Sequence, residues 1–262
     1  MKRYIKIYSL LLRLNLSALL AYRANFINSV IGTVGWGFVS IASMFLLTSR
    51  VTTVYGWTRE ELLTVTGVYS VIIGIFHMLC SRNVERFSRI INLGQLDSIL
   101  LKPTDPQFMV SLWLFNYASV FRIIMGIIFT IYMLQKMHIV VTLISFFGFI
   151  ILMISGLLLL YSVWFSIITI TIWFTNLTNL VDFLYGFSNL GRYPPEMIRR
   201  TGNLFLFIFL PLTFIATIPI KAILQKALPS DVLMLLLISW GFFFLTRKFF
   251  KFALRFYTSA SG

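Results

Sequence analysis

The chain has 262 residues, of which 59% are hydrophobic and 17% aromatic but only 11% are charged. This composition excludes an ordinary soluble domain and indicates several transmembrane helices. The net charge of +14 would suit nucleic-acid binding in a soluble protein, but the basic residues cluster at the ends of apolar runs, where they set topology and contact lipid headgroups. We therefore expect one polytopic domain, 1–262, in the lipid bilayer, with no nucleic-acid partner.

Residues 1–22 predict an amphipathic helix that lies in the membrane interface. At about 100° per residue, Lys2, Arg3, Lys6 and Arg13 share one face, and most of the leucines lie elsewhere. The segment does not fit a signal peptide, because Arg13 and Asn15 interrupt its apolar core and no small-residue cleavage site follows. We expect the N-terminus to stay in the cytoplasm.

Three membrane spans are predicted next, at about 24–48, 62–81 and 115–134. Each is long enough to cross about 30 Å of hydrocarbon at 1.5 Å per residue. In the second span, Gly67 and Gly74 are seven residues apart on nearly the same helical face, where small residues allow helices to approach closely. This pattern predicts tight packing of the second span against a neighbour.

Two polar residues near the inner ends of these spans need an interpretation. His77 is compatible with a transport pathway, but a packing or interfacial role is the better prediction. Arg122 would be costly at the bilayer centre, so the third span is placed with this residue near its inner third, where it can snorkel to the surface. Residues 106–114 are then expected along the inner interface.

The second half of the chain allows two topologies. In the first, spans at 139–173 and 177–190 are followed by an outer region, 192–228, that folds partly back into the membrane. Pro211 and Pro219 would break this region into two half-helices.

In the second topology, 176–200 is an inner surface segment and 203–220 crosses the membrane as one span. The positive-inside rule favours this second topology, whereas the two prolines favour the first. Both topologies have six crossings with a last span at about 231–246, and both place the two termini in the cytoplasm.

Motifs of common active sites are absent from the sequence. It contains no G-x-x-x-x-G-K-[ST] nucleotide loop, no H-E-x-x-H zinc motif and no G-x-S-x-G nucleophile elbow, and two histidines with one cysteine cannot form an ordinary metal site. We predict no catalytic residue, metal or cofactor in this chain. An ion channel or secondary transporter is the alternative to a driven pathway, although the spans lack the paired charges of ion-coupled carriers. An intramembrane enzyme is a weaker alternative.

Four sequence pieces, in their order and spacing, extend over nearly the whole chain. They are GQLDSILLKPTDPQF at 94–108, IWFTN at 172–176, GRYPPE at 191–196 and YTSASG at 257–262. Through these pieces the chain resembles the membrane subunits of ABC-2-type ABC exporters, most of all the branch of viologen and multidrug exporters. In that family the segment matching 191–196 begins an outer, partly re-entrant region, which favours the first topology.

The resemblance implies an all-α integral membrane protein with six transmembrane helices, an interface helix at the N-terminus and a cytoplasmic coupling helix between spans two and three. It also implies a separate ABC ATPase subunit that binds ATP and Mg²⁺, so this chain is not itself the enzyme. A second permease, as a homo- or heterodimer, would complete the pathway in the bacterial plasma (inner) membrane.

The charged stretch 82–106 is the coupling region under this resemblance. Short helices are expected at 88–93 and 95–101, separated at Gly94, with an apolar face of leucines and isoleucine that fits a groove on the ATPase. The alternative is a solvated loop that only sets topology. The residues expected to couple are Glu85, Arg86, Arg89, Gly94, Gln95, Leu96, Asp97, Ile99, Leu100, Lys102 and Pro103.

The transport pathway is expected between the first, second and fifth spans, which face the second permease in the family. Asp182 is a functional candidate as an intramembrane carboxylate, with a capping or packing role equally open. The proposed lining is apolar and aromatic, which suits a hydrophobic or cationic drug, a lipid or a peptide equally well. The candidate pathway residues are Trp36, Tyr69, Asp182, Phe183 and Tyr185.

Overall fold

The computed structural model describes residues 2–174, 179–199 and 204–258, and these residues form an all-α membrane fold, as predicted. One small antiparallel sheet occurs among them, in which Thr53 lies opposite Thr58 and Val54 opposite Trp57. The elements are α1 (Lys2–Ala21), α2 (Arg23–Leu47), β1 (Thr53–Val54), β2 (Trp57–Thr58), α3 (Arg59–Phe76), η1 (His77–Ser81), α4 (Arg82–Asn92), α5 (Gln95–Leu100), α6 (Pro106–Leu112), α7 (Ser119–Lys136), α8 (Leu143–Thr169), η2 (Ile170–Ile172), α9 (Leu180–Ser188), η3 (Asn189–Arg192), α10 (Pro195–Arg199), α11 (Leu204–Ile223), α12 (Pro229–Ala253) and η4 (Leu254–Phe256).

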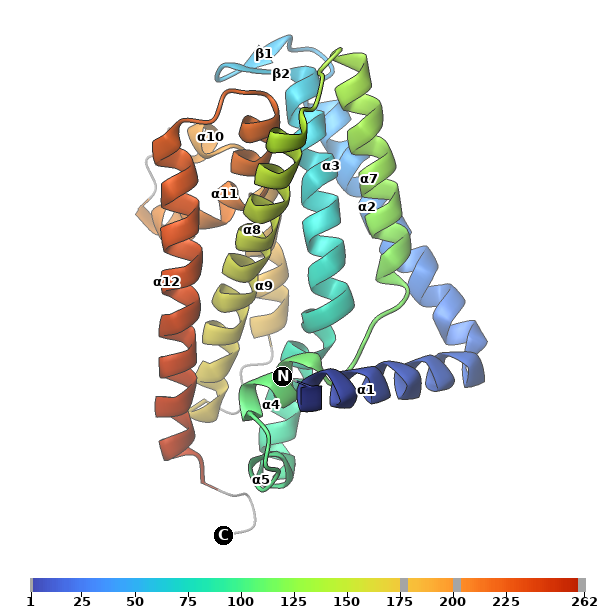
Figure 1. The fold of residues 1–262 in the computed structure, drawn as a ribbon, viewed down its shortest axis with the longest axis vertical. Coiled ribbons are helices and arrows are strands. Elements are labelled where there is room, and N and C mark those ends of the chain that lie inside the picture. The colour runs from blue at the N-terminus through green and yellow to red at the C-terminus, as the bar shows by residue number, and fades with distance from the viewer. Residues whose placement is uncertain (1, 175–178, 200–203, 259–262) are drawn as a thin grey trace.

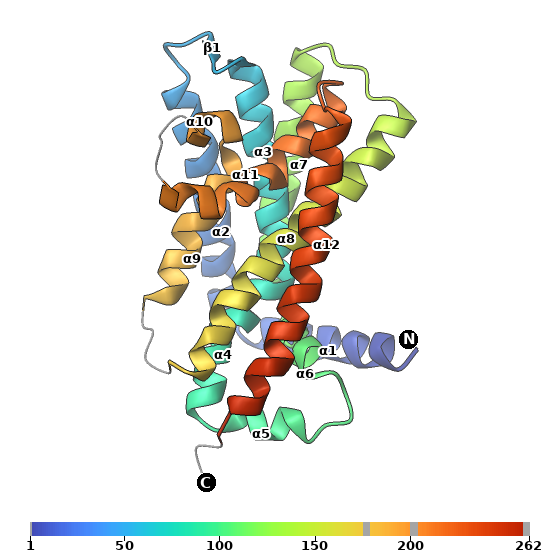
Figure 2. The same cartoon turned by 90° about the vertical axis from the view of Figure 1, so that its left-hand side faces the viewer.

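Five long helices, α2, α3, α7, α8 and α12, run along the bundle (Figure 1). The helix α1 lies across them, close to one end, and Figure 2 shows the same crosswise placement from the side. The β1–β2 hairpin marks one end of the molecule, which we call the hairpin end. The short helix α5 marks the other, which we call the α5 end. A helix crosswise to an upright bundle has the orientation of an interface helix.

Within the described residues, six helical runs are long and apolar enough to cross a membrane, and they differ from the six predicted spans in two places. They include Arg3–Ala21, which was predicted to lie in the interface, and they do not include the predicted span at 177–190. The described part of that span, 179–190, contains α9 and the first residues of η3, and α9 itself has nine residues and a length of about 14 Å. The indole N–H of Trp164 on α8 donates to Ser188 Oγ at 2.7 Å and fixes this short helix to the bundle.

The second predicted span does not end at residue 81. The elements α3, η1 and α4 form one helical run, Arg59–Asn92, which we call the central helix. It has 34 residues and is therefore about 51 Å long. It begins with a capping box, in which the backbone N–H of Glu61 donates to the Thr58 hydroxyl and the backbone N–H of Thr58 donates to the Glu61 carboxylate. Most of its apolar part is buried among the other helices.

The outer half-helices predicted around Pro211 and Pro219 are instead one helix, α11, which includes both prolines. It packs against α8 and η3. Figure 2 shows that α11 lies across the bundle and then rises to the hairpin end, where α12 begins. It does not run from one end of the bundle to the other, as the second topology required.

Ion pairs connect the segments that meet at the hairpin end. Lys221 Nζ is 3.0 Å from Glu196 Oε1 and 3.6 Å from Asp231 Oδ2, and the Trp57 indole N–H donates to Glu196 Oε2 at 3.2 Å. These contacts join β2, α10, α11 and α12. Three lysines that the first topology places at this end, Lys136, Lys221 and Lys226, thus have carboxylate partners, which reduces their effective charge.

Replacing Gly156 with alanine tests the contact between α8 and α11. An added Cβ would lie 2.6 Å from the backbone oxygen and 3.0 Å from the Cα of Ile215, and backbone atoms cannot move aside without shifting α11. We expect Gly156→Ala to lower stability by about 1–3 kcal/mol, seen as a lower midpoint of thermal unfolding in detergent. Gly148→Ala on the same helix is the control, since nothing lies within 4 Å of its added Cβ. Equal midpoints for the two variants would contradict the contact.

The Glu196 cluster predicts a pH dependence of stability. Partial burial by itself would raise the pKa of Glu196, but the hydrogen bond from its own backbone N–H and the contacts with Lys221 and Trp57 outweigh burial and hold the pKa below its ordinary value of 4.5. The stabilisation is therefore present above about pH 4.5 and is lost as the pH falls through the lower, folded-state pKa. We expect the unfolding midpoint to fall less on acidification in Glu196→Gln than in the unmodified protein. Glu60→Gln, which removes an exposed pair with Lys136, serves as the control.

Candidate functional site

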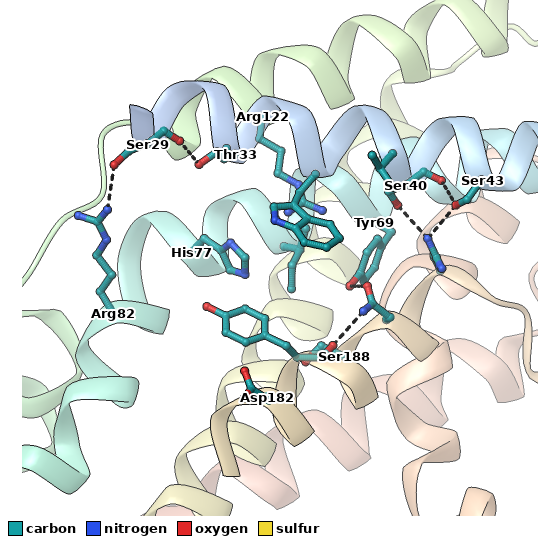
Figure 3. Close-up of a pocket in the computed structure, with 17 residues that line it drawn as sticks. Ser29, Thr33, Ser40, Ser43, Tyr69, His77, Arg82, Arg122, Asp182 and Ser188 are labelled. Carbon is teal, nitrogen blue, oxygen red and sulfur yellow. Dashed lines mark hydrogen bonds between the residues drawn. The ribbon is translucent and has the colours of Figure 1, made fainter. Parts of the chain in front are cut away.

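A cavity of about 590 Å³ lies between α2, α3, α7 and α9 (Figure 3). Its lining is polar for a membrane protein, with three arginines, one histidine, one aspartate, one asparagine and seven hydroxyl side chains. Only four of its seventeen lining residues are glycine or apolar. The lining of this cavity differs from the apolar, aromatic lining expected of the pathway, because the helices turn their few polar residues toward one another.

One wall of the cavity is a polar stripe on α2. Its residues recur every four or three positions, which places them on one face of the helix. The rest of α2 is mostly apolar, so this stripe is a signal that the sequence already carried. Its members are Ser29, Thr33, Trp36, Ser40 and Ser43.

Two of the cavity's arginines donate hydrogen bonds to this stripe. Arg82, at the start of α4, donates to Ser29 Oγ at 3.4 Å. Arg192, at the end of η3, donates to Ser43 Oγ at 3.1 Å and to Ser40 Oγ at 3.4 Å. They hold opposite ends of α2's polar face, as the labelled serines in Figure 3 show. The central helix and η3 are thereby fixed to α2.

The third arginine, Arg122, was predicted to snorkel but is buried. It is 6% exposed and points from α7 into the space between His77 and Tyr69 (Figure 3). Its Nε has no hydrogen-bond partner, and no carboxylate pairs with it among the described residues. The side chain turns inward because the cavity offers polar surroundings closer than the membrane surface.

The central helix changes its winding where it passes the cavity. The π-helical turn His77–Ser81 interrupts it, and such turns are rare and often lie at functional sites. The His77 ring meets the Tyr185 ring edge-on, with centroids 5.4 Å apart. The Tyr185 hydroxyl in turn donates to the Glu85 carboxylate on α4. A chain of contacts thus joins η1, α9 and α4 beside the cavity.

The structure brings most of the candidate pathway residues together. Trp36, Tyr69, Asp182 and Tyr185 all line the cavity, although they come from three helices far apart in sequence. Phe183 does not line it and is 39% exposed. Asp182 lies in the first turn of α9, where the helix dipole favours a carboxylate, and it lines the cavity as well.

A second hollow lies at the α5 end, in the predicted coupling region. This groove has a volume of about 380 Å³ and lies between α4, α5 and α6. Arg86, Gln95 and Ser98 line it, and Lys102 places its ammonium 4.7 Å from the ring centre of Trp113, also in the lining. The groove is therefore basic at its rim.

The helices of this region are separated at Gly94, as predicted. Gly94 has φ of +65°, a left-handed conformation that costs glycine little. The first helix, however, begins at Arg82 as a continuation of the central helix, and not at residue 88. Of the expected coupling residues, Glu85 and Asp97 are half-buried, and those exposed are Arg86, Arg89, Gln95, Leu100, Lys102 and Pro103.

Two of the three residues that form the apolar face predicted to dock on the ATPase are turned inward, and only Leu100 is exposed. Leu96 is fully buried and Ile99 is 9% exposed, both within the chain's own hydrophobic core. The exposed large apolar side chains of this region are Leu93, at 57%, Leu100, at 37%, and Leu101, at 85%. A leucine pattern at i and i+3 marks the buried face of a helix, but it does not say whether another chain or the same chain covers it.

A reciprocal pair of hydrogen bonds connects α4 to the chain that leads into α7. The backbone N–H of Leu114 donates to Asn83 Oδ1 at 2.6 Å, and Asn83 Nδ2 donates to the Leu114 carbonyl at 2.8 Å. The backbone N–H of Asn116 also donates to the Met78 carbonyl within the π-helical turn, at 2.9 Å. The chain before α7 therefore moves with the central helix.

Comparison with known proteins gives one match. A family model described as "ABC-2 family transporter protein" matches residues 34–261, which include most of the cavity lining and all of the groove at the α5 end. No curated protein and no solved structure matches the chain.

Two leucines of the coupling region separate a folding effect from a surface effect. Leu96→Asp buries a carboxylate in a fully apolar site, so we expect a loss of stability of several kcal/mol, about 3 or more, and poor recovery of folded protein. Leu101→Asp changes a side chain that is 85% exposed, and its unfolding midpoint is expected to match that of the unmodified protein. Thermal unfolding in detergent measures both, and a stable Leu96→Asp variant would contradict the burial.

Proposed function

The chain belongs to the ABC-2 family of transporter proteins, and we propose that it is the permease subunit of an ATP-driven exporter. It is a multi-pass membrane protein and a transport component, not the subunit that hydrolyses ATP. In this proposal a separate ABC ATPase binds ATP and Mg²⁺, and a second permease, identical or different, completes the pathway. The outward direction of transport follows the resemblance to viologen and multidrug exporters.

The observation that carries the proposal is the central helix. Its α4 part lines the groove at the α5 end, and its η1 and α3 parts line the cavity. A displacement of α4 is therefore transmitted to the cavity without passing through a flexible joint. A permease needs such a connection if an ATPase bound at the α5 end is to move a cargo through the cavity.

The ATPase contact is proposed on the exposed side of the α5 end. Leu93 and Leu101 supply apolar surface there, and Arg86, Arg89 and Lys102 surround it with positive charge. An apolar centre with a charged rim is the usual composition of a specific protein interface. The predicted coupling region thus keeps its proposed role, but with different leucines at its centre.

The α5 end is proposed to lie in the cytoplasm of a bacterium, at its inner membrane. The last helix carries Arg247, Lys248 and Lys251 toward this end, followed by Arg255 in η4, and α1 also lies nearer to it than to the hairpin end (Figure 1). Such a cluster beside a span favours the inner side. At the hairpin end, lysines such as Lys221 pair with carboxylates, which supports its placement outside.

A second permease is proposed to close the cavity. The lining residue Trp36 is 71% exposed, and its neighbours Ile31 and Phe38 on α2 are 65% and 67% exposed. The cavity is thus open along one flank of α2. A facing copy or a homologous chain would complete its wall and separate the pathway from lipid.

Substituting the exposed leucines tests the coupling surface. We expect Leu93→Asp combined with Leu101→Asp to lower the amount of ABC ATPase that co-purifies with the full chain by at least about tenfold, since a hot-spot residue contributes about 2 kcal/mol or more. Leu228→Asp, an exposed leucine at the hairpin end, is the control and should leave the complex intact. Both variants must first match the unmodified protein in unfolding midpoint.

Failure of this test has a definite form. If the double variant retains the ATPase at the wild-type level, the proposed surface is wrong. If the unmodified chain binds no ATPase and passes anions through liposomes without ATP, the chain works as a channel, and the exporter proposal fails.

A further inference from the structure

The charge and shape of the cavity indicate a class of cargo. We propose that the cavity binds an amphiphile with an oxyanion headgroup, a phosphate or a carboxylate, and that the headgroup is passed along Arg82, Arg122 and Arg192 while the apolar tail stays beside α2. Transport of this cargo rests on the function proposed above. Its binding is a property of this chain alone, so the two can be tested separately.

The first argument is the spacing of the arginines. They contact α2 at three heights, the lowest and highest of which are fourteen residues apart, or about 21 Å along the helix. This is a large part of the roughly 30 Å of hydrocarbon that a cargo must cross. Arg82 lies at Ser29, Arg122 at Gly37 and Arg192 at Ser43.

The second argument is the balance of charge. The lining contains three arginines and one carboxylate, Asp182, which lies in the first turn of α9, where the helix dipole offsets part of its charge. Glu85 lies next to the cavity but accepts a hydrogen bond from the Tyr185 hydroxyl and does not line it. The lining is therefore positive, and its hydroxyl groups add donors for an oxyanion.

The third argument is the unpaired state of Arg122. A guanidinium at this depth is costly unless an anion or water compensates its charge, and its Nε is buried without a partner. Its Cγ lies 3.4 Å from the position of a Cβ added to Gly37, which places the guanidinium stem in van der Waals range of this part of α2. An incoming oxyanion supplies the partner that the described residues do not.

The fourth argument concerns the tail. Trp36 and Val39 belong to the lining but are 71% and 52% exposed, so the cavity continues onto the lipid-facing flank of α2. The volume of about 590 Å³ lies in the range of about 300–1,000 Å³ typical of sites for drug-sized ligands. A free phosphate ion needs only a small part of this space. An amphiphile can fill the cavity with its headgroup and leave its tail among the acyl chains.

The same charges disfavour a cationic cargo. A dication of the viologen type would meet three arginines in a region of low dielectric, where like charges repel strongly. The resemblance to viologen exporters thus does not extend to the cargo.

Binding titrations of the detergent-purified full chain test the proposal. The probes are oleoyl lysophosphatidic acid and oleate as anions, monooleoylglycerol as a neutral amphiphile with the same tail, hexadecyltrimethylammonium as a cation, and inorganic phosphate as a free anion. We expect at least one oleoyl anion to bind about tenfold or more tightly than monooleoylglycerol, because a hydrogen bond to a charged group contributes about this much. Which of the two anions binds identifies the headgroup.

Matched variants locate the binding. Arg122→Gln should weaken binding of the anionic amphiphile about tenfold or more, and Lys136→Gln, which changes a 53% exposed side chain near the hairpin end, should leave it unchanged. Removing an unpaired buried charge is not expected to lower the unfolding midpoint. If Arg122→Gln fails to fold, Arg192→Gln, at another height of α2, provides the same comparison.

The outcomes are distinct. Equal binding of the neutral, cationic and anionic amphiphiles overturns the proposal, and so does wild-type affinity in both arginine variants. Phosphate that binds as tightly as the amphiphiles shows a site for a free anion and overturns the role of the tail. An ATPase complex without anion binding supports the exporter function and rejects this cargo. Anion binding without an ATPase complex supports the binding site and rejects the exporter function.

Discussion

The continuity of the central helix is the constraint on which the rest of the structure depends. A helix of about 51 Å is longer than the hydrocarbon layer, so Arg59–Asn92 must extend beyond the layer at one end or both. Its capping box fixes the hairpin end, and Gly94 stops it at the α5 end. The other parts of the site are attached to the central helix. The helix α7 packs along it, α9 contacts it through Tyr185, and the chain before α7 is hydrogen-bonded to Asn83.

Much of the fold followed from the sequence, and the reasons for the exceptions are physical. Apolar runs of about twenty residues are a strong signal, so α2, α3, α7, α8 and α12 lie close to the predicted spans. Helix ends were harder to predict. The sequence becomes polar at Arg82, but the helical hydrogen bonds continue from Ser81 into α4, so the span does not end there. The prolines of α11 led to a prediction of two half-helices, but the structure has one helix. Packing of α11 against α8 outweighs the backbone hydrogen bonds that the prolines remove.

The candidate site was predictable only in part. Tyr69 and Tyr185 were named because aromatic residues stood in the right spans, and the structure places both at the cavity. The arginines were missed as lining residues, since Arg82 was placed in the coupling stretch 82–106, Arg192 in the GRYPPE piece at 191–196 and Arg122 near the membrane surface. Whether a basic residue faces lipid, water or a cavity depends on the rotation of its helix relative to the others. Leu96 shows the same limit, because its helical pattern is equally compatible with burial in its own chain.

The positions of the three arginines connect the two ends of the molecule. Arg82 belongs to the central helix itself. Arg122 follows the chain before α7, which is hydrogen-bonded to Asn83 and Met78 of the central helix. Arg192, by contrast, is held by the serines of α2 near the hairpin end. In the proposed exporter, a displacement of α4 by the ATPase moves Arg82 and Arg122 together and breaks the Arg82–Ser29 hydrogen bond, while Arg192 stays with α2. The distance between successive anion contacts then changes during the cycle, and a headgroup held by Arg122 can be released toward Arg192. The buried guanidinium of Arg122, whose Nε has no partner, thus lies between an arginine of the central helix and an arginine held by α2.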